Sequence, residues 1–489
     1  MRPSILAGAL AAMVAAPASL AAQAKTRVAS LDRTVVPPAG KTPELRVPSW
    51  TKTTLPDGAR LIVSERHGLP LVSFQINFVG GANQYEPANE TGIAALAAAM
   101  LSEGTATRTG DQLSDELQSL GTAIQVSVTG ESGRIAFQST SDKFAPTLAI
   151  LADMLEHPTI PAAALERRRA STLVGLTQSR DRTAGIAAVV FPKVIYTTAS
   201  PLGRTANEAS IKAITRDDVA SFVKTYFSPA HAVITVVGDV RTADVRGTVE
   251  RALAGWTGGS EPTFAYPVPP AAKATTIYLV DKPGAAQSTF SIGFAGPPRD
   301  TPDYYAIRVM NELLGGLFQS RLNHDIREVK GYSYGVGSSF AYGRGPGPFR
   351  AGGEIVTAKS DSALLEFMKQ LRDIRGSVPP SDDEMQQAKA SLVQSLPASF
   401  ESVAGVNAAI ASIYTQGLPE DYYQRFARAV NAVTKDDVVR VAQKYIDPDH
   451  LAIVIVGDRA RIEAPLAATK IAPIVLLDTS GSAVDTSKP

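Results

Sequence analysis

Residues 215–239 read TRDDVASFVKTYFSPAHAVITVVGD, and residues 434–458 read TKDDVVRVAQKYIDPDHLAIVIVGD. The two stretches share Thr, Asp-Asp-Val, Tyr, Pro, His and Val-Gly-Asp at matching positions, with a constant separation of 219 residues. This agreement indicates an internal duplication, in which each copy is one structural unit. The same fold is therefore expected twice in succession.

Each repeated stretch predicts a helix followed by a strand. Thr215 and Thr434 are expected N-caps, and the Asp residues that follow suit the positive end of a helix. A Pro-containing turn then leads to an apolar, β-branched strand that ends in Gly-Asp. Strand-like runs begin both copies, at 59–65 and 71–81 in the first and at 275–281 and 288–296 in the second. Long helical runs follow, for example at 302–317 and 362–374 in the second copy. The pattern predicts an α+β fold of two tandem homologous units, each a mainly antiparallel sheet with helices packed on one face.

The N-terminus has the features of a secretory signal. Arg2 is followed by a small apolar run and then by Ala22-Gln23-Ala24, which predicts a signal peptide over residues 1–24 and export, with the bacterial periplasm as the simplest location. An anchor helix is the alternative, but the run is Ala-rich and shorter than the ~20 strongly apolar residues of a membrane span. The expected parts are a signal peptide 1–24, a flexible segment 25–47, a first domain 48–257, a linker 258–274, a second domain 275–470 and a flexible tail 471–489.

Composition narrows the possible functions. The chain has 489 residues, of which 44% are hydrophobic, so two or more domains can each bury a core. Lys and Arg total 48 against 47 Asp and Glu, so no net field favours nucleic acid or an anionic membrane. No later segment has the length and hydrophobicity of a membrane span, and the absence of cysteine means that the exported chain is stable without disulfides.

Histidines and a serine motif provide weak evidence for a catalytic centre. The chain has five histidines: His67, His157, His231, His324 and His450. No two of them lie three or four residues apart, so no helix is predicted to place two histidine ligands for zinc on one face. GYSYG at 331–335 matches Gly-x-Ser-x-Gly with Ser333 as nucleophile, but that motif needs a strand before the serine and a helix after it. The order here is reversed. The repeated histidines are expected to be structural.

Two other motifs have structural explanations. The glycine cluster GRGPGPFRAGG at 343–353 contains prolines without backbone donors and is followed by no Gly-Lys-Ser/Thr, which argues against a phosphate site and for a loop between strands. The basic run in LERRRASTL, which begins at Leu165, is typical of the solvated face of a helix.

TGIAALAAAMLSEGT at 91–105 predicts a helix whose interior side chains can neither bind a ligand nor catalyse a reaction. With the two repeated α+β units, it resembles the pitrilysin or insulinase-type zinc peptidases, the inverzincins, whose helix reads Gly-x-Ala-His-x-x-Glu-His-Met-Leu-x-x-Gly-Thr. The residues that match this pattern are Gly92, Ala94, Met100, Leu101, Gly104 and Thr105. The resemblance spans about residues 48–460.

The resemblance places the zinc ligands on residues that cannot bind metal. The two histidines fall on Ala95 and Ala99, the catalytic glutamate falls on Ala98, and the distal glutamate falls on Leu176 or, one residue earlier, on Gly175. Alanine and leucine preserve helix propensity but have no ligand atoms. No cofactor is therefore expected in this chain.

The second half departs from the family much less. SRLNHDIREVKGYSYGVGSS at 320–339 closely resembles the C-terminal signature, in which an Arg and a Tyr seven residues apart reach a substrate bound at the zinc of the other half. These positions are Arg327 and Tyr334. The neighbouring Tyr332 leaves open which tyrosine points inward, and a buried Arg and Tyr that hold the helix–strand corner is the structural alternative.

The lost zinc ligands of the first half and the retained Arg/Tyr signature of the second half together resemble a non-zinc subunit of this family. It is expected to pair with a zinc-bearing chain of the same fold and to supply Arg327 and Tyr334 for peptide hydrolysis, with no activity alone. The competing hypothesis is a peptide-binding or scaffold protein that acts without a catalytic partner.

Overall fold

The computed structural model of the protein describes residues 45–259 and 266–484. The predicted signal peptide, residues 25–44, residues 260–265 of the predicted linker and residues 485–489 lie outside the described residues. Among the described residues no single helix is long and apolar enough to cross a membrane; the one pair that meets the criteria jointly, Asp382–Phe400 with Val403–Thr415, is bent by 113°.

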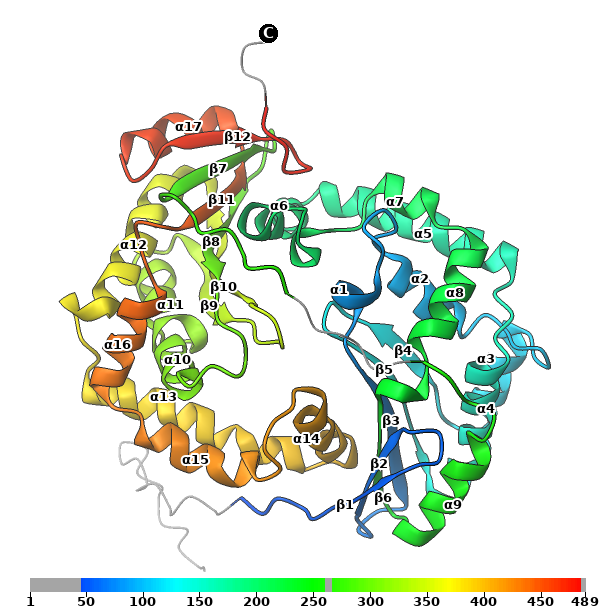
Figure 1. The fold of residues 1–489 in the computed structure, drawn as a ribbon. Helices are drawn as coiled ribbons and strands as arrows, with labels where there is room; N and C mark the ends of the chain where they lie inside the picture. The colour runs from blue at the N-terminus through cyan, green and yellow to red at the C-terminus, as the bar shows by residue number, and fades with distance from the viewer. Residues whose placement is uncertain (1–44, 260–265, 485–489) are drawn as a thin grey trace, which may run out of the picture. The chain divides into compact units, whose positions relative to one another are not determined.

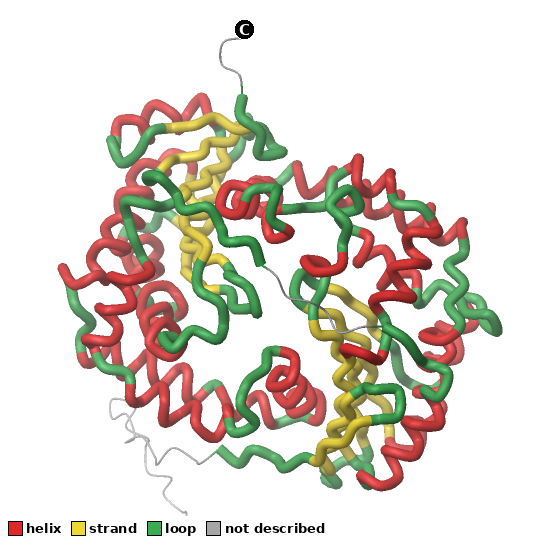
Figure 2. Tube along the Cα trace, viewed as in Figure 1, coloured by secondary structure: helices red, strands yellow, loops and turns green. Residues whose placement is uncertain are grey.

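Two six-stranded sheets, drawn in yellow in Figure 2, form the centre of the two repeats. Four of the five strand pairs in the first sheet are antiparallel, and three of the five in the second. The first sheet has the order β1 (Thr51–Thr54), β2 (Arg60–Glu65), β6 (Ala232–Gly238), β3 (Leu71–Val79), β5 (Ser132–Thr140), β4 (Gln125–Val128). The second has the order β12 (Ile474–Leu477), β7 (Thr276–Asp281), β11 (Ala452–Gly457), β8 (Gln287–Ala295), β10 (Pro348–Val356), β9 (Ser333–Phe340). The predicted α+β architecture is confirmed.

The helices lie between the strands in sequence (Figure 1). Those of the first repeat are α1 (Ala82–Tyr85), α2 (Ile93–Met100), α3 (Gly110–Ser119), α4 (Phe144–Glu156), α5 (Ala162–Arg180), α6 (Thr183–Tyr196), α7 (Glu208–Ala213), α8 (Arg216–Tyr226) and α9 (Thr242–Ala252). Those of the second are α10 (Tyr304–Asn311), α11 (Arg321–Asn323), α12 (Ser360–Arg372), α13 (Asp382–Gln394), α14 (Val403–Thr415), α15 (Tyr422–Ala432), α16 (Lys435–Tyr445) and α17 (Arg459–Ala468).

The repeated helices α8 and α16 begin with the same cap. Asp218 N donates to Thr215 Oγ1 (3.2 Å), and Thr215 N donates to Asp218 Oδ2 (2.8 Å). Thr434 and Asp437 form the same reciprocal pair at 3.1 and 3.0 Å. This capping box satisfies backbone donors at each helix start and confirms both predicted N-caps.

One face of each sheet packs against helices of its own repeat. Alternation along β3 directs Phe74 and Phe78 into the first core, which also contains buried side chains of α2, α4 and α8. The equivalent strand β8 directs Phe290 and Ile292 into the second core with α10 and α12. These cores hold the functional elements described below.

The opposite faces are covered by an exchange of helices. α6, from the first repeat, packs on β8 and β11 of the second sheet, with Val190 and Phe191 among its buried contacts. α14, which lies 219–220 residues later, packs on β3 and β6 of the first sheet, with Val406 and Ile410 buried. Each repeat therefore contributes one helix to the other, which the sequence did not predict.

Asn407 anchors α14 to the first sheet. Its side chain is fully buried, and Nδ2 donates to the carbonyl oxygens of Ser73 (2.7 Å) and Thr235 (3.1 Å). The Thr235 hydroxyl donates to Asn407 Oδ1. Since buried polar groups are costly without partners, these bonds fix one register of α14 on the strands.

Two expected flexible segments prove to be partly ordered. The predicted tail 471–489 contains β12, which pairs in parallel with β7, because the apolar run Ile474–Leu477 completes the edge of the second sheet. Leu45 and Val47, expected within the flexible segment 25–47, pack against the apolar cluster under α14. Apolar contact with distant elements orders both segments.

Candidate functional site

Helix α2 begins at a cap built by a carboxylate. Gly92 precedes it with φ 105°, a conformation that favours glycine, and a Cβ there would lie 2.6 Å from Ile211 Cδ1. Glu86 Oε1 accepts from the N–H groups of Gly92 (3.0 Å) and Ala94 (2.9 Å). Burial raises the pKa of Glu86, while these two donors act in the opposite direction. The backbone N–H groups at the start of this helix therefore have a hydrogen-bond acceptor within the chain, and the helix start does not depend on a metal.

We call Ala95, Ala98, Ala99 and Leu176 the four vestigial positions. Ala95 is exposed, Ala99 is half-buried and Ala98 is 3% exposed, and α2 packs against α5, which contains Leu176. None of the four side chains has a nitrogen, oxygen or sulfur atom. Within residues 45–259 and 266–484 no group of three or more His, Cys, Asp or Glu could hold a metal ion. The residues at this place do not fit zinc.

The structure distinguishes the two candidates for the distal position by their surroundings. Leu176 is half-buried and packs against the first core. Gly175 is exposed, and a Cβ there would meet no atom within 4 Å. A carboxylate would thus be accommodated more easily at 175 than at 176.

Arg327 lies in a π-helical turn, His324–Val329, directly before the strand that contains Tyr334. Gly331, at φ 66°, turns the chain between them. The guanidinium carbon of Arg327 lies 4.6 Å from the ring centroid of Phe318, and its Nε lies 3.1 Å from Oε1 of Glu328. The Arg327 side chain is 36% exposed. Single π-helical turns occur frequently at functional sites.

The two tyrosines of this signature have opposite environments. Tyr334 is 86% exposed, whereas Tyr332 is half-buried and packs against the second core. Lys359 Nζ lies 5.7 Å from the Tyr332 ring centroid. The exposure of Arg327 and Tyr334 does not match a buried pair that holds the helix–strand corner. It leaves both groups accessible to a ligand or a partner chain.

Ser333 does not form a nucleophile elbow. It is the first residue of β9, and its Oγ donates to the carbonyl oxygen of Glu354 (2.6 Å) and accepts from the N–H of Gly335 (3.0 Å). His450 instead contacts Asp447 through Nδ1 (2.7 Å). This serine therefore stabilises the β9–β10 pairing, and the observed order of helix then strand is the reverse of a nucleophile elbow.

The repeated histidines have different surroundings. His231 is 4% exposed and stacks on Tyr85, with Phe78 and Tyr226 also in ring contact. Burial lowers its pKa to about 4. His450 is exposed and lies beside a pocket at the end of α6, which is discussed below.

The basic run on α5 is engaged in contacts within the chain. Arg167 and Arg168 both contact the carboxylate of Glu103, at 2.5 and 2.7 Å, and Arg169 donates to the carbonyl oxygen of Ile214 (2.7 Å). The run therefore joins α5 to its neighbours and is more than a solvated face. Phe318 and Glu86 carry no signal in the sequence, because each acquires its role only through a contact in three dimensions.

Comparisons with known proteins agree on one group. The family model described as "Insulinase (Peptidase family M16)" matches residues 63–205, and the one described as "Peptidase M16 inactive domain" matches residues 213–392. A solved structure from Pseudomonas fluorescens, titled as a peptidase M16 inactive domain, has a TM-score of 0.77 and 26% identity and covers 83% of this chain and 98% of its own.

Curated relatives carry contrasting names. A protein of Rickettsia felis named "Uncharacterized zinc protease" is 23% identical over 392 residues, which are 78% of this chain and 93% of the relative. A Helicobacter pylori protein named "Non-peptidase homolog YmxG" is 21% identical over 404 residues, which are 82% of this chain and 92% of the relative. Similarity to these relatives therefore does not show whether this chain is an active peptidase, and the evidence on that question is the identity of the residues at the four vestigial positions.

Proposed function

The chain belongs to peptidase family M16, and from this premise we propose that it is a zinc-free subunit of a heteromeric metallopeptidase. In this proposal it associates with a separate zinc-bearing chain of the same fold. Arg327 and Tyr334 then act on a peptide bound at the partner's metal. The location is the periplasm, for which the support is the N-terminal signal pattern of residues 1–24.

The single observation that carries the proposal is the contrast between the two halves. The four vestigial positions have no ligand atom, while the Arg/Tyr signature is retained and Tyr334 is 86% exposed. The inactive-domain descriptions and the non-peptidase relative support a chain that is inactive alone.

The chemistry expected of the two side chains is electrostatic. The Tyr334 hydroxyl donates a hydrogen bond to the oxyanion that develops on a scissile carbonyl. The Arg327 guanidinium donates to a carbonyl or carboxylate of the peptide, and its fork geometry orients that group. Its contact with the Phe318 ring limits the number of rotamers that Arg327 can adopt, which reduces the entropy lost when substrate binds.

The experiment begins with affinity capture of the mature chain from its own periplasm, to recover a zinc peptidase. Turnover per assembled complex is then compared for wild type, Tyr334→Phe and Arg327→Ala. Loss of one oxyanion donor typically lowers the rate by roughly 10²- to 10³-fold, and Tyr334→Phe is expected to show this with unchanged assembly. Arg327→Ala should also raise KM.

Tyr332→Phe is the matched control, because it removes the same hydroxyl two residues away. If it abolishes turnover while Tyr334→Phe has no effect, the active tyrosine has been assigned to the wrong residue. If no variant changes turnover per complex, the two groups do not act in trans. Failure to capture any zinc peptidase favours the second candidate, a peptide-binding scaffold, for which the non-peptidase relative is the supporting observation.

A further inference from the structure

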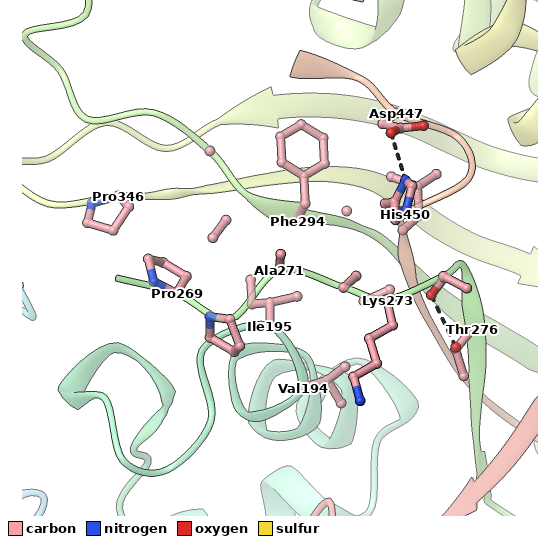
Figure 3. A pocket seen from close by; sticks show the side chains of 18 of the residues that line it. Val194, Ile195, Pro269, Ala271, Lys273, Thr276, Phe294, Pro346, Asp447 and His450 are labelled. Atoms are coloured by element: carbon pink, nitrogen blue, oxygen red, sulfur yellow. Dashed lines mark hydrogen bonds and ion pairs between the residues drawn. The ribbon is translucent and has the colours of Figure 1, made fainter. Parts of the chain in front are cut away.

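A pocket of about 880 Å³ lies where the exchanged helix α6 ends against the second sheet (Figure 3). Its walls come from both repeats: the end of α6 with Val194 and Ile195, the chain segment 269–274, and the ends of β7, β8 and β11. We call it the α6 pocket. Its volume is in the range of small-molecule sites.

The α6 pocket has an apolar end and a polar end. Figure 3 shows Pro269 and Pro346 on the left and the pair Asp447–His450 on the right, with Lys273 also toward the right beside Val194. Phe294 and Ile195 lie between the two ends, as Figure 3 also shows. Asp447 lies 2.7 Å from Nδ1 of His450 and accepts a hydrogen bond from the backbone N–H of Asp449 (3.1 Å). Lys273 forms no hydrogen bond or ion pair with any described residue.

The duplication provides an internal comparison for this pocket. Val194 and Ile195 correspond, 219 residues later, to Ile413 and Tyr414 at the end of α14, where a smaller hollow of about 600 Å³ lies against β1 and β2. Thr276, the first residue of β7, corresponds to Arg60, the first of β2. The two hollows therefore both lie where an exchanged helix ends.

The corner in the first repeat contains an aromatic group and a carboxylate from the chain itself. Trp50 packs against the cluster under α14 and donates from Nε1 to the Tyr414 hydroxyl (2.8 Å). Lys52 Nζ lies 2.6 Å from Glu420 Oε1 and 5.9 Å from the Tyr414 ring centroid. The lysine of this corner is thus neutralised by a carboxylate beside an aromatic surface.

The corner in the second repeat lacks that carboxylate. The residue 219 positions before Glu420 is Pro201, which has no charge. Among the described residues that line the α6 pocket, the acidic one is Asp447, which is paired with His450. An apolar surface and a lysine without a partner are left side by side.

We propose that the α6 pocket binds a small molecule, or the end of a peptide, that joins an apolar body to a carboxylate. The apolar body occupies the end formed by Pro269, Phe294 and Ile195, and the carboxylate pairs with Lys273, in the way that Trp50 and Glu420 complete the first corner. Because both repeats build the walls, bound ligand stabilises the exchanged helix α6 in place. This inference is independent of the peptidase role, since neither Arg327 nor Tyr334 lines the pocket.

The test uses the full mature chain and defined probes. Binding of 3-phenylpropionate is measured by titration calorimetry, beside 3-phenylpropanol, which keeps the apolar body and loses the charge. Saturable binding of the acid is expected, with an unfolding temperature that rises with its concentration. N-acetyl-Ala-Phe and its C-terminal amide form a second pair, which distinguishes a peptide carboxylate from a free acid as the source.

Two variants and one control locate the site. Lys273→Gln is expected to weaken binding of the acid by about tenfold or more without changing that of the alcohol. Ala271→Phe, at an exposed position in the pocket wall, should abolish binding of both while the far-UV spectrum is retained. Lys212→Gln makes the same charge change outside the pocket and should have no effect. The proposal is overturned if neither carboxylate binds at millimolar concentration, or if Lys273→Gln and Lys212→Gln bind the acid equally.

Discussion

The substitution Asn407→Ala tests whether the helix exchange is held by one buried amide. Nδ2 has two hydrogens, directed at the carbonyl oxygens of Ser73 and Thr235, and Oδ1 accepts from the Thr235 hydroxyl. Three neutral hydrogen bonds at about 1 kcal/mol each give about 3 kcal/mol. The space left by the amide adds roughly 0.7 kcal/mol, at about 24 cal/mol per Å³ for ~30 Å³. A loss of about 3–4 kcal/mol in the free energy of unfolding is expected.

The assay is urea denaturation followed by far-UV circular dichroism and by tryptophan fluorescence. Trp50 is one of only two tryptophans and donates to Tyr414 of α14, so its emission reports whether α14 is docked. Ser412→Ala is the matched control on the same helix, because its Oγ contacts the Ala409 carbonyl (2.8 Å) and the Tyr423 hydroxyl (2.9 Å), neither of which belongs to the first sheet. We expect less than about 1 kcal/mol for that change. Equal losses for the two variants would refute the argument that Asn407 anchors α14.

Three further outcomes are expected. Purified protein should hold far less than one zinc per chain after dialysis, because the four vestigial positions lack ligand atoms; elemental analysis that finds about one tightly held zinc would overturn this. Placing His, Glu, His and Glu at those positions should restore zinc binding measured by the same method. A parallel variant with Gly175→Glu in place of Leu176→Glu covers the other candidate for the distal ligand; well-folded variants of both kinds that take up no zinc would show that the alignment is wrong. Protonation of His231 should destabilise the fold, because its pKa of about 4 in the folded protein lies below the ~6.5 of an unfolded histidine. The free energy of unfolding should therefore decrease as the pH falls from about 6.5 toward 4, by roughly 2 kcal/mol between pH 7 and 5. His231→Phe should remove that difference, and identical pH profiles for the two proteins would contradict the assignment.

Local patterns in the sequence determined most of the secondary structure and the nature of each repeat. Thr215 and Thr434 with their Asp partners specify helix starts through bonds that span three residues, so they are visible in the chain itself. The β-branched runs that become β6 and β11 are buried along their whole length, which explains their nearly continuous hydrophobicity. The missing ligand atoms on α2 were likewise evident, because they depend on residue identity alone.

Tertiary structure decided which partner each apolar surface meets. α6 is apolar over most of its surface, which predicts burial but does not specify the sheet that buries it, and its contacts with β8 and β11 join residues far apart in the chain. The short run that forms β12 has no regular pattern of its own and becomes a strand because the edge of β7 is available. Likewise, the sequence leaves open whether Tyr332 or Tyr334 points inward, and the structure distinguishes them because Tyr332 packs against the second core while Tyr334 is exposed. Hydrophobic attraction is non-directional, so a sequence encodes that a surface is buried, whereas the geometry of the whole chain selects what covers it.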